Sequence, residues 1–115
     1  MTFPEAIDWL STKTIDDKVL FNKLLLSSMT IMNRAIVNDH TTSDTTKIEC
    51  LKLSNELAHR VWNLIFELET GIDNKSEIEL ADNINFYQQQ SGELSGHLTA
   101  TFKSTLERFN KIKGE

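Results

Sequence analysis

The chain has 115 residues, of which 17 are acidic and 12 are basic, giving a formal net charge of −5 at pH 7. This length supports one domain, residues 1–115, with a single hydrophobic core. A hydrophobic fraction of 39% excludes a disordered chain. The acidic balance, with its dispersed lysines and arginines, disfavours nucleic acid as a partner.

The first residues and the apolar runs indicate a cytoplasmic protein without a membrane anchor. Residues 1–5 lack the basic segment and the long apolar run of a signal peptide. No uninterrupted apolar run approaches the ~20 residues of a membrane-spanning helix. The single proline and the four glycines favour a few long helices over a many-stranded sheet.

A short helix is predicted at the N-terminus. Thr2 and Glu5 have the spacing of a capping box, and the helix then runs to about Leu10. Trp9 has two interpretations: it covers the end of a helical bundle as a lid, or it anchors a partner at the surface. Residues 11–14 form a hinge before the next helix.

The second predicted helix begins after Thr14, which is suited to an N-cap, and runs to about Val37. Its wider apolar side carries Leu20, Phe21, Leu24, Leu25, Ile31, Met32 and Ala35. The other side carries Val19, Leu26 and Val37, among the polar residues Asn22, Thr30 and Asn33. A helix that is apolar on two sides is either central in the fold or covers a homodimer seam or a partner groove.

A polar loop over residues 38–44 leads into the clearest amphipathic helix, from Thr46 to Gly71. Thr46 and Glu49 have capping-box spacing. Three earlier residues are alternative caps: Thr42, Ser43 and Asp44. Gly71 is suited to the left-handed conformation that ends many helices.

This helix has one face for a core and one for solvent. The core face carries Cys50, Leu53, Leu57, Val61, Leu64 and Leu68. The stripe is widened on one side by Leu51, Ala58, Trp62 and Ile65. The opposite, polar side carries Lys52, Glu56, His59, Arg60, Asn63 and Glu67.

The last predicted helix starts at a capping box formed by Ser76 and Glu79. Its apolar positions stay in one helical phase: Leu80, Ile84, Tyr87, Leu94, Leu98, Phe102, Phe109 and Ile112. One straight helix over this stretch would be about 55 Å long. Because that exceeds the other helices, we predict a kink or break near residues 88–92. The predicted fold is an all-α up-and-down bundle of three long helices, the last kinked or broken, plus the short N-terminal helix.

The sequence indicates neither a metal nor a cofactor. Cys50 lies on the apolar stripe and is interpreted as a small buried hydrophobe. Glu56 and His59 match the Glu-x-x-His unit of di-iron bundles, but they lie on the polar side of their helix. A second copy of the unit is absent, because Glu93 and His97 are four residues apart and not three.

One pair of residues points to an enzyme. Arg34 and His40 are separated by five residues at the end of a helix. This arrangement resembles the arginine–histidine motif of the HEPN family of small all-α ribonucleases and nucleotide-binding proteins. The resemblance implies that Arg34 and His40 act at a scissile phosphate, where a cation holds the phosphate and an imidazole moves a proton.

The absence of other chemical motifs favours a non-enzymatic function. We expect a small acidic protein-binding module, of the inhibitor, immunity, antitoxin or adaptor type, whose negative surface matches a basic partner. The two-sided apolar helix adds a homodimer as an alternative. The candidate partner-binding residues are Trp9, Leu26, Val37, Glu56, Arg60 and Glu67.

Overall fold

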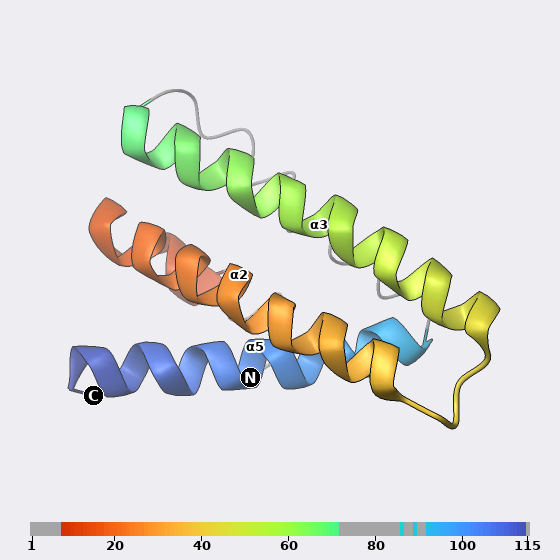
Figure 1. Ribbon diagram of the computed structural model, residues 1–115. Helices are drawn as coiled ribbons and strands as arrows, with labels where there is room; N and C mark the ends of the chain where they lie inside the picture. Colours follow the sequence, from red (N-terminus) through yellow and green to blue (C-terminus); the bar gives the residue numbers. More distant parts are fainter. Residues whose placement is uncertain (1–7, 72–85, 87–88, 90–91, 115) are drawn as a thin grey trace.

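The computed structural model describes residues 8–71, 86, 89 and 92–114 (Figure 1). Residues 8–11 are helical, and three long helices follow: α2 (Ile15–Asn38), α3 (Asp44–Thr70) and α5 (Gly92–Lys113). Within these described ranges there is no strand. The predicted all-α class is therefore confirmed. The capping boxes predicted at Thr2 and Ser76 lie outside the described residues.

The ends of α2 and α3 follow local hydrogen bonding. The Thr14 side chain caps α2 by accepting a hydrogen bond from the backbone N–H of Asp17, as predicted. At α3 the cap is Ser43, one turn earlier than Thr46, because the Ser43 hydroxyl accepts from the Thr46 backbone N–H. Gly71 has a φ of 72°, which confirms the predicted left-handed end of α3.

Helix α2 is the central element. It packs along both α3 and α5, whereas α3 and α5 make few contacts with each other (Figure 1). Of the two interpretations of its two-sided apolar pattern, the central position is confirmed. Both neighbours run antiparallel to α2, as an up-and-down arrangement requires (Figure 1).

Helix α5 begins at Gly92, and the break predicted near residues 88–92 lies mostly outside the described residues. Its first turn lies beside the α2–α3 loop, with Thr42 Oγ1 3.3 Å from Glu93 Oε2. The C-terminal end of α3, at Gly71, lies about 40 Å away at the other end of that helix.

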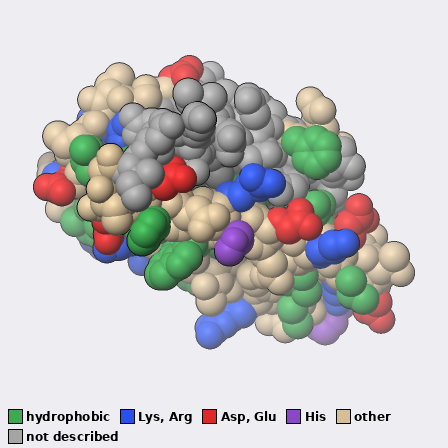
Figure 2. All heavy atoms as spheres, turned by 90° about the horizontal axis from the view of Figure 1, so that it is seen from above, with side chains coloured by type: hydrophobic (Ala, Val, Ile, Leu, Met, Phe, Trp, Pro, Cys, Tyr) green, Lys and Arg blue, Asp and Glu red, His purple; other side chains and the backbone are tan. Residues whose placement is uncertain are grey.

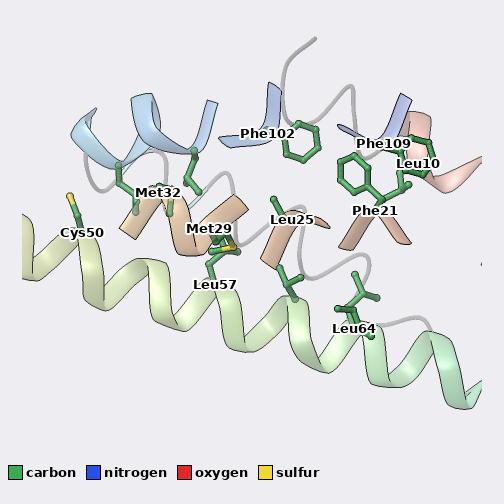
Figure 3. Close-up of a cluster of buried hydrophobic side chains, with 14 of the residues drawn as sticks. Leu10, Phe21, Leu25, Met29, Met32, Cys50, Leu57, Leu64, Phe102 and Phe109 are labelled. Atoms are coloured by element: carbon green, nitrogen blue, oxygen red, sulfur yellow. The ribbon is translucent and has the colours of Figure 1, made fainter. Parts of the chain in front are cut away.

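The core lies where α2 faces its two neighbours (Figure 3). Phe21 forms an aromatic cluster with Phe102 and Phe109, with ring centroids 5.2 Å and 5.8 Å from its own. Trp9 covers this cluster edge-on, 5.5 Å from Phe109 and 6.2 Å from Phe21. The half-buried Trp9 thus packs at the end of the bundle, as the lid interpretation predicts. Cys50 is 1% exposed, which confirms it as a core residue.

Five predicted burial assignments are wrong. Two of them concern Ala35 and Ile112, which were expected on the apolar faces of their helices and are exposed. Ile31 was expected in the core and is exposed, while Asn22 was expected outside and is buried. Asn22 is tolerated there because its Nδ2 donates a hydrogen bond to the Lys18 carbonyl oxygen at 2.8 Å. Trp62 was expected to widen the core stripe of α3, but 61% of its surface is exposed.

Candidate interaction surface

The candidate site is the outward side of α3, named here the outer α3 surface. Its residues are Ile48, Asn55, Glu56, His59, Arg60, Trp62, Asn63 and Phe66, all of them exposed. Figure 2 looks onto this side and shows hydrophobic side chains at the surface with charged groups and histidine between them. The surface has a polar half and an apolar half.

The polar half is an open depression of about 560 Å³. It is lined by Asn55, Glu56, His59, Arg60 and Asn63, which recur at helical spacing on one side of α3. The depression therefore presents amide, carboxylate, imidazole and guanidinium groups together. A partner could meet both donors and acceptors there.

The apolar half contains Trp62 and Phe66, each 61% exposed. Ile48, 67% exposed, lies about 21 Å from Trp62 along the helix axis. Trp62 and Phe66 are one turn apart and share a face. Trp62 is five residues from the buried Leu57, which places it about 140° round the helix from that core position. Phe66 is about 180° round from Leu57 by the same count. Neither aromatic ring can therefore reach the core that Leu57 occupies.

Helix α2 borders the apolar half. The two helices are joined by a hydrogen bond from Ser54 Oγ to Asn33 Oδ1, 2.6 Å long. Toward the loop, Lys47 Nζ donates to the Val37 carbonyl oxygen at 3.3 Å. At the other end, Lys23 and Glu69 form an exposed ion pair of 2.9 Å.

The predicted partner-binding residues are distributed unevenly over this region. Glu56 and Arg60 lie together in the polar depression, whereas Glu67 is only half-exposed. On α2, Val37 is 55% exposed and Leu26 is half-buried against the core. The partner-binding role of all six residues, Trp9 included, stays a prediction.

Sequence reasoning missed the two exposed aromatic residues of the outer α3 surface. Trp62 was assigned to the core stripe because it is apolar, and Phe66 was not assigned at all. The helical phase carried the signal, since both residues are more than a quarter turn from the Leu57 line. The prediction for Trp62 followed its apolar character and not its angular position on the helix.

The arginine–histidine pair of the HEPN-like interpretation is exposed at the end of α2. Arg34 borders an open depression of about 280 Å³ with Thr30, Asn33, Val37 and Asn38. His40 is exposed in the following loop and does not line that depression. A shared phosphate site for Arg34 and His40 stays a prediction.

The fold and surface define a small all-α bundle with an amphipathic outer helix. No helix in the described ranges is long and apolar enough to cross a membrane. A comparison with models of known families found no match. Comparisons with curated proteins and with solved structures also found none.

Proposed function

We propose that this protein is a non-enzymatic protein-binding module that uses the outer α3 surface to hold a basic segment with apolar side chains. The observation that carries the proposal is the pair of exposed aromatic rings, Trp62 and Phe66, beside a polar depression. Tryptophan and arginine are the residue types most enriched among side chains that dominate binding energy. Trp62 is such a residue in the apolar half, and Arg60 is one in the polar depression, about 160° round the helix from Trp62.

The net negative charge of the chain favours a basic partner. The chain carries five more acidic than basic residues, so its surface attracts a basic partner and speeds the encounter. Glu56 lines the depression and contributes a carboxylate to the surface that would meet a lysine or arginine of the partner. In this proposal, burial of the apolar half supplies the affinity, and the Glu56 carboxylate orients the bound partner.

A pair of synthetic helical peptides tests the proposal. One peptide carries leucine on one face and lysine on the other, and the second has glutamate in place of every lysine. We expect the lysine peptide to bind the full chain in fluorescence anisotropy and the glutamate peptide not to bind. Added salt should weaken the complex, because part of the attraction is between surface charges.

Matched variants separate this surface from charge attraction alone. The double variant Trp62→Ser, Phe66→Ser should weaken lysine-peptide binding at least tenfold, since each ring is an anchor of the kind that costs about 2 kcal/mol or more when truncated. Ile31→Ser is the control, because Ile31 is as exposed as Trp62 but lies outside the outer α3 surface. Equal binding by the double variant and the control would contradict the proposal.

A homodimer formed through the α2 residues Leu26 and Val37 is the alternative to binding of a basic partner at the outer α3 surface. Light scattering of the isolated protein distinguishes the two cases. We expect a monomer that binds the lysine peptide. A dimer that is lost when Leu26 and Val37 are changed to aspartate would contradict the basic-partner proposal and support self-association.

A further inference from the structure

Three potential metal ligands converge where the α2–α3 loop meets the first turns of α5. They are Asp39, Glu93 and His97, and one ligand atom from each lies within 4.8 Å of the others. Asp39 follows the last residue of α2, whereas Glu93 and His97 are one turn apart on α5. The fold therefore joins two segments that are more than fifty residues apart in the sequence.

Thr42 lies between the two carboxylates. Its hydroxyl oxygen lies 2.7 Å from Asp39 Oδ2 and 3.3 Å from Glu93 Oε2, within hydrogen-bonding reach of both. Asp39 Oδ1 accepts two further hydrogen bonds from Thr41, one from its backbone N–H at 2.9 Å and one from its hydroxyl at 2.6 Å. Since a carboxylate has about four acceptor positions, Asp39 keeps one on Oδ2.

Asp39 and Glu93 bring two carboxylates close together at this position. Like charges at such a distance repel each other, and a bound cation would remove that cost.

His97 lines two separate hollows of the structure. It borders a cavity of about 180 Å³ between α2 and α5. With Glu93 it also lines an open depression of about 490 Å³. Three protein ligands and this space leave room for the water molecules that complete the coordination of a metal.

We propose that Asp39, Glu93 and His97 bind one divalent transition-metal ion and thereby fasten the α2–α3 loop to α5. Two carboxylate oxygens and one imidazole nitrogen suit Zn²⁺ or Mn²⁺, whereas Ca²⁺ and Mg²⁺ prefer oxygen ligands alone. This proposal departs from the expectation drawn from the sequence. That expectation rested on the position of Glu56 and His59 on the polar side of their helix and on the missing second Glu-x-x-His copy. The Glu93–His97 pair acquires its third ligand only through the fold.

Calorimetric titration of the full chain with ZnCl₂, after treatment with a chelator, tests the proposal. We expect one saturable equivalent and a higher Tm in the presence of the ion, because binding to the folded state alone stabilises it. MgCl₂ at the same concentration should raise the Tm less. Absence of saturable zinc binding to the wild-type chain would overturn the proposal.

Substitutions identify the ligands. His97→Ala and Glu93→Gln should each weaken zinc binding by at least about tenfold, since even residues that only hydrogen-bond to a metal ligand contribute that much to affinity. His59→Ala is the matched control, because His59 also follows a glutamate on an exposed helix face but lies outside the cluster. Loss of binding in His59→Ala together with full binding in His97→Ala would overturn the assignment.

Thr42 provides an independent test as a positioning residue. Thr42→Val removes the hydroxyl that lies between the carboxylates and should weaken zinc binding by about tenfold. Thr42→Ser keeps that hydroxyl and should restore the affinity. Circular dichroism of the metal-free variants shows whether the helices are intact, and equal zinc affinity in Thr42→Val and wild type would contradict the role of Thr42.

Discussion

Helices α2 and α3 are similar in length, yet they use their apolar residues differently. Helix α2 lies between two neighbours and buries its one aromatic ring, that of Phe21, which is 1% exposed. Helix α3 packs mainly on α2 and leaves two large aromatic rings, Trp62 and Phe66, in solvent. The comparison teaches that the place of a helix in the bundle decides burial more than residue type does.

The largest expected effect comes from the buried face of α2. Phe21→Ala should lower the free energy of unfolding by about 3–5 kcal/mol, because Phe21 is 1% exposed and contacts three aromatic rings. Trp62→Ala on α3 removes a larger side chain but should change stability by less than about 0.5 kcal/mol. Urea unfolding of both variants measures the difference. A comparable loss in the two variants would contradict the contrast between the helices.

A smaller effect is expected in the first turn of α2. Lys113 Nζ lies 2.8 Å from Asp17 Oδ1, and chiefly this hydrogen bond lowers the pKa of Asp17 from its usual 3.8. A carboxyl group with a lowered pKa in the folded state stabilises the fold above its unfolded pKa, and this contribution is lost as the pH falls through the folded pKa. Lys113→Met should therefore raise the pKa of Asp17. It should also reduce the change in folding stability over the pH range between the folded and unfolded pKa values of this carboxyl group.

An NMR titration of the Asp17 carboxyl group measures this shift. Lys111→Met is the matched control, since Lys111 is a neighbouring lysine in the same last turn of α5. An Asp17 pKa that is the same in Lys113→Met and wild type would show that the ion pair is not formed in solution.

Much of the fold followed from local signals in the sequence. The Thr14 cap and the Gly71 end are set by side-chain and backbone chemistry within one turn, so they could be predicted. The Ser43 cap could not be selected, because several polar residues in that loop are chemically suitable. The burial of Asn22 and the exposure of Ile31 depend on where α3 and α5 pack, which helical periodicity alone does not specify.

The candidate sites were predicted less completely. Glu56 and Arg60 were assigned to the surface from their phase on α3, and they are exposed together. The cluster of Asp39, Glu93 and His97 could not be found by spacing, because its residues meet only after α5 returns to the α2–α3 loop. Long-range pairing of this kind is a property of the tertiary structure.

Tryptophan fluorescence tests the central claim most directly, namely that α3 presents Trp62 to solvent as part of a binding surface. In the Trp9→Phe variant only Trp62 emits, and we expect the red-shifted emission of a solvated indole with strong quenching by iodide. Adding the lysine peptide should shift this emission to the blue and reduce the quenching. Blue-shifted, protected emission from the isolated monomer would contradict an open outer α3 surface.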